Sequence, residues 1–257
     1  MIESSTIASA ASHGDSLMET IKYGTSDEQR IDMHLPEGDV HGLAILVHGG
    51  FWRSSFSSAL MSGLAAYLVD RGWKVANIEY RRTGTGGEWP VAMKDVRAAI
   101  NTVSQQHRES HPGARSIVIG HSAGGHLALL AADLVDGVVA LAPVTDMVRC
   151  DEEGLGEDAA REFMRSSNRE NPDEYRLASP AYATPPGARI LVVHGDCDER
   201  VPVAHSRKYV SDTLIGMDAQ YKELENMTHR ALIDPEEEHW TEVLAWMRSD
   251  SKDAGNP

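Results

Sequence analysis

The chain has 257 residues, of which 41% are apolar and 25% are charged, a composition typical of a water-soluble globular protein. Its 39 acidic and 24 basic residues give a formal net charge of −15, and such a surface repels phosphate backbones and anionic lipids. Composition and charge therefore argue against nucleic acid and against membrane surfaces as partners.

The N-terminal residues 1–17, rich in Ser and Ala, predict a loose segment. They lack the basic start and the long apolar core of a secretory signal, and no apolar run in the chain has the length that spans a bilayer. Two cysteines, Cys150 and Cys197, are too few for a disulfide scaffold, so we expect two free thiols, with a bridge between them left open. A cytoplasmic protein is the expectation.

Alternating strand and helix patterns predict one α/β domain over residues 18–257. Residues 19–24 and 29–36 alternate apolar and polar side chains and predict two antiparallel edge strands. Six further strands are predicted at 44–48, 74–80, 116–121, 137–143, 189–195 and 220–226. Helices are predicted at 57–70, 89–109, 123–134, 202–217 and 235–249, with Gly72 as a left-handed cap and Pro202 and Pro235 in first turns. This order is typical of a mostly parallel sheet, here of about eight strands, with helices on both faces.

One insertion interrupts this alternation of strands and helices. Residues 145–186 are polar, acidic and Pro-rich near their end, and they are too many for a simple connection between a strand and a helix. The interpretation that we prefer is a small helical cap over the carboxyl ends of the strands. The alternative is a solvated excursion without a function.

The stretch "GHSAG" at 120–124 places Ser122 between a predicted strand and a predicted helix, with glycines two residues away on either side. This is the pattern of a nucleophile elbow, in which a strained turn exposes the serine hydroxyl above the sheet edge. The turn also places the serine at a helix N-terminus, where unpaired N–H groups stabilise negative charge.

A nucleophilic serine needs a base, and the base needs an orienting carboxylate. In this architecture the acid comes next in the chain and the histidine last. Asp196 and Asp198 follow a predicted strand, and we favour Asp198 because it lies further into the loop, whereas Asp196 is expected to bond its own backbone in the turn. Of the 12 histidines, only His229 lies between the last predicted strand and the last predicted helix.

An oxyanion intermediate requires backbone donors that are already in place. Ala123, the residue after the nucleophile, supplies one N–H group. The loop "HGGFWR" at 48–53 supplies the others, and the N–H groups of Gly50 and Phe51 are the candidates. The aromatic side chains of Phe51 and Trp52 are candidate substrate contacts, and core packing is an equally weighted alternative for Trp52.

Four segments in this order, "HGGFW", "GHSAGGHLA", "HGDCDERVP" and "THRALIDP", resemble the α/β-hydrolase superfamily. The likeness is strongest to its carboxylesterase and kynurenine formamidase (arylformamidase) branch, and it spans roughly residues 20–250. The resemblance implies an α/β-hydrolase fold and a serine hydrolase without a cofactor, whose partner is a small ester or N-formyl arylamine. It implies Ser122 as nucleophile, Asp198 as orienting acid and His229 as base, with Gly50, Phe51 and Ala123 as the oxyanion hole. Related enzymes often have an aromatic residue directly after this histidine, where this chain has Arg230.

Two other functions compete with hydrolysis. A binding protein that keeps the pocket without useful turnover would share the fold. A metal site built from "HGDCD" at 194–198 has suitable donor atoms, but they crowd one short loop without a second cluster. A homodimer through the edge strands or the final helix is compatible with the pattern and is not required by it.

Overall fold

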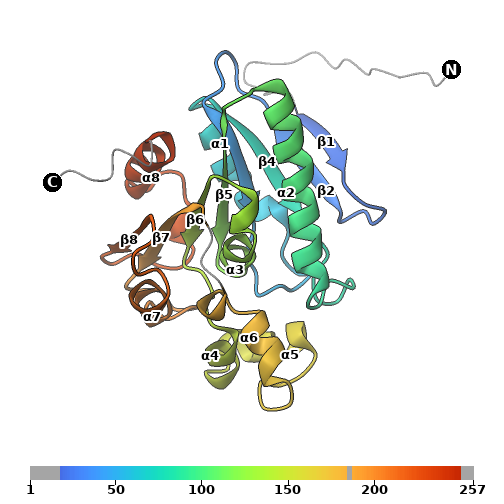
Figure 1. Cartoon of the computed structure of the whole chain (residues 1–257), viewed down its shortest axis with the longest axis vertical. Helices are drawn as coiled ribbons and strands as arrows, with labels where there is room; N and C mark the ends of the chain where they lie inside the picture. Colours follow the sequence, from blue (N-terminus) through green and yellow to red (C-terminus); the bar gives the residue numbers. More distant parts are fainter. Residues whose placement is uncertain (1–17, 184–186, 250–257) are drawn as a thin grey trace.

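The computed structural model describes residues 18–183 and 187–249, and its centre is an eight-stranded sheet (Figure 1). The strand order is β1-β2-β4-β3-β5-β6-β7-β8. The strands are β1 (Met18–Lys22), β2 (Arg30–His34), β3 (Gly42–Val47), β4 (Trp73–Glu79), β5 (Arg115–His121), β6 (Gly137–Leu141), β7 (Arg189–Gly195) and β8 (Ala219–Leu224). β2 runs antiparallel to β1 and β4, and all other neighbours are parallel. The predicted mostly parallel sheet of about eight strands is confirmed.

The prediction that residues 29–36 form an edge strand was wrong. β2 lies inside the sheet, hydrogen-bonded to β1 on one side and β4 on the other. Its alternation of buried Ile31 and Met33 with half-exposed neighbours reflects one covered face of the sheet. An antiparallel strand with one solvated face has this pattern wherever it lies in the sheet, so alternation alone does not indicate an edge.

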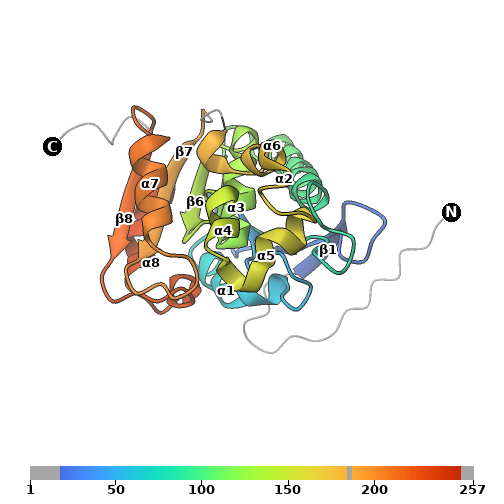
Figure 2. The same cartoon turned by 90° about the horizontal axis from the view of Figure 1, so that it is seen from below.

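Helices cover both faces of the sheet (Figure 2). The 3-10 turn η1 (Ser58–Met61), α1 (Ser62–Val69) and α8 (His239–Arg248) pack on one face. On the other lie α2 (Val91–Ser110), α3 (Ala123–Leu130), the short turn η2 (Ala132–Leu134) and α7 (Ala204–Asp212). Among the described residues, no helix combines the length and the apolar character needed to cross a bilayer.

Of the three predicted helix-boundary residues, Gly72 lies where it was predicted and the two prolines do not. Gly72, with φ of 82°, follows α1 in a left-handed conformation, as predicted, and its N–H donates to the carbonyl oxygen of Val69 at 2.9 Å. Pro202 lies just before α7, and Pro235 lies in a turn ahead of α8, so neither is in a first turn. Proline also fits the turns that precede helices, which is why composition alone misplaced these two starts.

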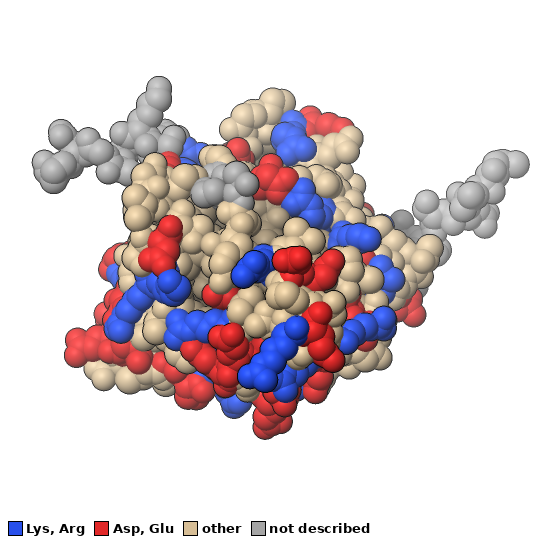
Figure 3. Space-filling view, turned by 60° about the horizontal axis from the view of Figure 1, so that its bottom comes forward, with Lys and Arg blue, Asp and Glu red and all other residues tan. Residues whose placement is uncertain are grey.

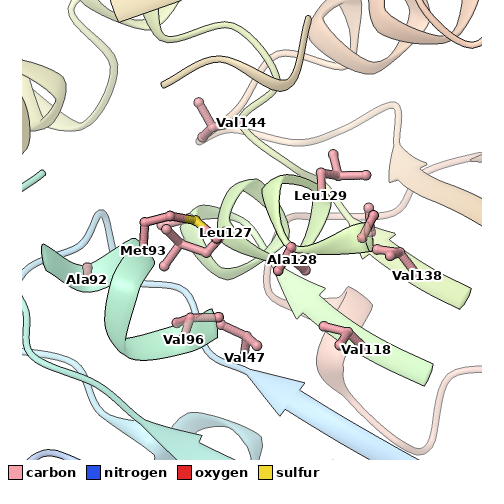
Figure 4. Close-up of a cluster of buried hydrophobic side chains, with 14 of the residues drawn as sticks. Val47, Ala92, Met93, Val96, Val118, Leu127, Ala128, Leu129, Val138 and Val144 are labelled. Atoms are coloured by element: carbon pink, nitrogen blue, oxygen red, sulfur yellow. The ribbon is translucent and has the colours of Figure 1, made fainter. Parts of the chain in front are cut away.

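The core between the sheet and α2 and α3 holds the elbow end of β5 in place. Val47, Val118 and Val138 of the central strands lie against Val96 of α2 and Leu127 of α3 (Figure 4). All five side chains are fully buried. Burial of each such side chain contributes about 1.5–3 kcal/mol, so the turn between β5 and α3 is held by two packed elements.

The insertion between β6 and β7 is helical and docked on the domain. It contains α4 (Met147–Glu152), α5 (Leu155–Met164), α6 (Pro172–Leu177) and the 3-10 turn η3 (Pro180–Tyr182), which gather at one end of the sheet (Figure 1). Its fully buried apolar side chains include Met147, Cys150, Phe163 and Tyr175. The alternative of a solvated excursion is therefore wrong. The predicted N-terminal segment 1–17 and positions 184–186 lie outside the described residues.

Candidate active site

Ser122 lies at the sharp turn between β5 and α3. Its φ of 57° and ψ of −118° form a conformation that non-glycine residues rarely adopt. Its N–H donates to the carbonyl oxygen of Leu141 at 2.8 Å, and its carbonyl oxygen accepts the N–H of His126 at 3.0 Å. Such backbone strain persists only where the surroundings enforce it, and it is concentrated at functional sites.

The glycines on either side of Ser122 are required by close backbone approaches. A Cβ on Gly120 would lie 2.3 Å from the carbonyl oxygen of Gly124. A Cβ on Gly124 would lie 2.0 Å from the carbonyl oxygen of Val47 on the neighbouring strand β3. No side chain fits at either position without moving the backbone, which is the steric reason for the spacing in "GHSAG".

Asp198 and His229 are hydrogen-bonded to each other. His229 Nδ1 lies 2.6 Å from Asp198 Oδ2, and the Asp198 side chain is fully buried. Asp198 Oδ1 accepts the N–H groups of Arg200 and Val201, each at 2.8 Å. Burial alone would raise the pKa of Asp198, but hydrogen bonds from His194 and His229 outweigh it and hold that pKa far below its ordinary value. The carboxylate therefore stays charged at neutral pH and holds the proton of His229 on Nδ1.

The loop after β7 holds Asp198 in a way that sequence reasoning missed. His194 Nε2 lies 3.2 Å from Asp198 Oδ2 and 2.9 Å from the carbonyl oxygen of Val201, so this nitrogen carries a proton. Its Nδ1 pairs with Ser206 Oγ at 2.7 Å. The spacing of His194 and Asp198, four residues apart across the end of β7, is the signal in the sequence that could have indicated this contact.

Within the described residues, the side chain of the neighbouring Asp196 makes no hydrogen bond to the backbone of its own turn, contrary to the prediction. Its Oδ1 accepts the N–H of Asn226, in the loop after β8, at 2.6 Å. The turn bonds that were expected for Asp196 belong to Asp198 instead. Asp196 thus joins the loops after β7 and β8, which brings the loop that contains His229 close to Asp198.

Ser122 and His229 line the same pocket, together with His121. Within the described ranges, no hydrogen bond joins Ser122 Oγ to the His229 ring. Such a bond is often long in a free enzyme and shortens when substrate binds. With Nδ1 committed to Asp198, Nε2 is the nitrogen left for the serine.

His121 holds the backbone of His229 through a hydrogen bond. Its Nε2 donates to the carbonyl oxygen of His229 at 3.0 Å, and the two rings are 4.5 Å apart between centroids. Burial lowers the pKa of His121 to about 3, with a smaller contribution from the nearby His229. His121 therefore stays neutral and does not compete with His229 as a base near pH 7.

The loop after β3 has the strained backbone expected of an oxyanion loop. Gly50, Phe51 and Trp52 have φ of 111°, 52° and 57°. Gly50 and Phe51 line the pocket, and Ala123 begins α3 directly after Ser122. Among the described residues, no acceptor bonds the N–H of Gly50, Phe51 or Ala123, so these donors remain available to a developing negative charge.

A buried hydrogen bond between two side chains supports this loop. His48 Nε2 lies 3.0 Å from Glu79 Oε1, and both side chains are almost fully buried. Burial alone would raise the pKa of Glu79, but hydrogen bonds from His48 and Ser58 and the charge of Arg82 lower it. Glu79 is therefore charged at neutral pH and helps to fix the start of the loop through His48.

Trp52 is a core residue and not a substrate contact. It is fully buried, it stacks on Phe163 of the insertion at 4.8 Å, and it is absent from the pocket lining. Its Nε1 donates to His126 Nδ1 at 3.2 Å, while His126 Nε2 donates to the carbonyl oxygen of Ala178 at 2.6 Å. Because the indole is fully buried and stacked on Phe163, the core-packing alternative describes this residue.

The pocket has a volume of about 490 Å³ and is closed on one side by the insertion. Gly154, Leu155, Gly156 and Glu157 at the start of α5 contribute to its wall. Gly156, Glu157 and Asp158 have φ near 60°, a short left-handed turn within the segment. A Cβ on Gly156 would lie 2.4 Å from the ring of Phe51, so the insertion and the oxyanion loop are in close contact beside Ser122.

The segment 194–198 is not arranged as a metal centre. Both His194 nitrogens and the side chains of Asp196 and Asp198 have protein partners. Over residues 18–183 and 187–249, no three His, Cys, Asp or Glu side chains converge as ligands. Cys150 is buried and Cys197 is exposed, and both are free thiols.

The sequence matches a known protein family, and the fold is similar to those of solved esterase structures. A family model described as BD-FAE matches residues 31–213. A truncated carbohydrate esterase from gut microbiota is 21% identical, covers 93% of this chain and 97% of that chain, and has a TM-score of 0.77. Esterase B from Lactobacillus rhamnosis, inhibited by a tributyrin phosphonate, is 18% identical, covers 93% of this chain and 87% of that chain, and has a TM-score of 0.74. At these identities the two structures show the α/β-hydrolase fold alone.

A curated relative of a different size shares part of the sequence. The non-reducing polyketide synthase atr1 of Stereocaulon alpinum is 30% identical over 128 residues, which is 45% of this chain. The match covers only 5% of that synthase, so it concerns a small part of a much larger protein.

Proposed function

Because the chain belongs to the BD-FAE family of α/β-hydrolases, we propose that it is a serine esterase that cleaves small carboxylic esters through an acyl-enzyme on Ser122. The observation that carries the proposal is the Asp198–His229 hydrogen bond of 2.6 Å beside a pocket that Ser122 also lines. The two similar structures, a carbohydrate esterase and esterase B, support ester cleavage over other hydrolytic reactions.

The mechanism follows from which groups hold protons. His229 Nε2 takes the proton of Ser122 as Oγ bonds to the ester carbonyl carbon, and Asp198 stabilises the imidazolium that forms. The carbonyl oxygen becomes an oxyanion, which accepts hydrogen bonds from the N–H groups of Gly50, Phe51 and Ala123. When the carbon–oxygen bond breaks, Nε2 returns its proton to the leaving alcohol. Water, deprotonated by the same nitrogen, then frees the acid and restores Ser122.

Two alternatives remain as outcomes of a test. Cleavage of an N-formyl arylamine uses the same residues, but the BD-FAE match gives it no support. A binding protein without turnover shares the fold, but it has no need of a charged, buried Asp198 bonded to His229.

We expect p-nitrophenyl esters to be hydrolysed faster than N-formylkynurenine. The ratio of kcat/KM between the best ester and the formamide should be about 100 or more, because p-nitrophenoxide is a much better leaving group than an arylamine. The measurement is a panel of acetyl, butyryl and octanoyl p-nitrophenyl esters beside N-formylkynurenine. A preference for the formamide would establish the arylformamidase alternative, and no turnover of any substrate would favour the binding protein.

A further inference from the structure

Among the three arginines that line the pocket, one has no partner in the described part of the chain. Arg53 Nε lies 2.7 Å from Glu162 Oε2, and its other end donates to the carbonyl oxygen of Glu157 at 3.0 Å. Arg200 Nε lies 3.8 Å from Glu199 Oε1. In the described part of the chain, the guanidinium of Arg230 makes no hydrogen bond or ion pair, although it lines the pocket with Ser122 and His229.

A free cation here is not explained by the general surface charge. The chain has a net charge of −15, and acidic and basic side chains lie interspersed on the face that Figure 3 shows. Guanidinium groups form charge-assisted bidentate hydrogen bonds with carboxylates, which gives both affinity and orientation. An unpaired arginine beside a reaction centre is therefore available to bind an anionic part of the substrate.

The place of Arg230 in the chain indicates which part of the substrate it meets. His229 must give its proton to the leaving alcohol, so the alcohol part of the ester departs on the His229 side of Ser122. Arg230 is the next residue. Resting on the proposed esterase function, we propose that the preferred esters carry a carboxylate on their alcohol part and that Arg230 binds this carboxylate.

The other residues that line the pocket indicate the chemistry of the part of the substrate that joins the ester to the carboxylate. Phe51, Phe56, Leu60, Leu155 and Ile233 line the same space. Apolar and aromatic walls beside an arginine that no described acidic group pairs suit a phenol or a similar flat alcohol that bears a carboxylate.

Glu157 also lines the pocket, and its carboxylate interacts through its charge with Arg53. It belongs to the insertion and not to the loop that contains His229. A cationic leaving group would be attracted to Glu157 and repelled by Arg230, so a cationic substrate is the sharpest comparison for the proposal.

The test compares three acetate esters of matched shape. These are para-acetoxybenzoate, the neutral para-acetoxybenzamide and the cationic para-acetoxyphenyl-trimethylammonium. In the native enzyme we expect kcat/KM for the carboxylate to exceed that for the amide by about tenfold to a hundredfold. In Arg230→Gln this ratio should fall to near one, and in Arg230→Glu the cation should become the best substrate.

The matched control is Arg108→Gln, an exposed arginine near the end of α2, just ahead of β5 and away from the pocket lining. It removes the same charge and should leave the ratio unchanged. Because each ratio is compared between variants, differences in intrinsic reactivity of the three esters cancel. The preference should also weaken as salt is added, since the arginine is solvent-exposed.

Two kinds of failure are distinguishable. If Arg230→Gln leaves the carboxylate-to-amide ratio of kcat/KM at its native value, the proposal is overturned while the esterase function stands. If no ester, including the neutral one, is hydrolysed in a manner that depends on Ser122, the proposed function itself fails and the specificity proposal fails with it.

Discussion

Replacing Ser122 with alanine should lower kcat/KM for p-nitrophenyl acetate by about 10⁴-fold or more. Removing the hydroxyl removes the nucleophile, and only the oxyanion donors and the pocket remain to assist attack by water. Alanine retains the Cβ that already tolerates φ of 57° at this turn. The free energy of unfolding should therefore change by less than about 1 kcal/mol, measured by urea denaturation.

A matched control is Ser104→Ala, which truncates a buried serine of α2 that does not line the pocket. Its turnover should equal that of the native enzyme. Substantial residual turnover in Ser122→Ala, with the fold intact, would exclude Ser122 as the nucleophile.

The second large effect is expected for Asp198→Asn, with a loss of kcat of about 10³–10⁴-fold. Asp198 Oδ1 accepts two backbone N–H groups, so the asparagine oxygen should keep that position. The amide NH₂ then points at His229 Nδ1, which must become an acceptor. The ring proton moves to Nε2, and that nitrogen is no longer free to take the serine proton.

Asp196→Asn provides the comparison, because Asp196 Oδ1 accepts the N–H of Asn226 and no contact within the described residues joins the Asp196 side chain to His229. An asparagine oxygen can accept the same bond, so kcat should change by no more than a few-fold. Both variants are assayed on p-nitrophenyl acetate across pH 5–9. Equal losses in the two variants, or a greater loss in Asp196→Asn, would remove Asp198 from the orienting role.

Much of the fold could be predicted from periodicity because parallel strands buried on both faces form short apolar runs. β3, β5, β6 and β7 are buried along nearly their whole length, and the sequence shows each of them as such a run. The internal position of β2 could not be predicted, because its neighbours in the sheet, β1 and β4, are not apparent from its alternation. Helix starts depend on turn geometry, which the prolines marked only approximately.

In the candidate site, the sequence motifs predicted the residues whose backbone conformation only certain amino acids can adopt. A Cβ on either glycine beside Ser122 would lie only 2.0–2.3 Å from a backbone carbonyl oxygen, so these positions must be glycine and are visible in the sequence. The direction of the Trp52 side chain and the contact between His194 and Asp198 depend on three-dimensional packing between distant segments. No local pattern specifies those contacts.

The proposed reaction depends on one physical relation: the imidazole of His229, oriented by Asp198, activates the hydroxyl of Ser122. The most direct measurement is the rate at which a fluorophosphonate probe bonds covalently to the protein, with the modified residue identified by mass spectrometry. We expect modification at Ser122 alone, and a rate at least about 100-fold lower in His229→Ala. Modification of a different residue, or an unchanged rate in His229→Ala, would contradict the account.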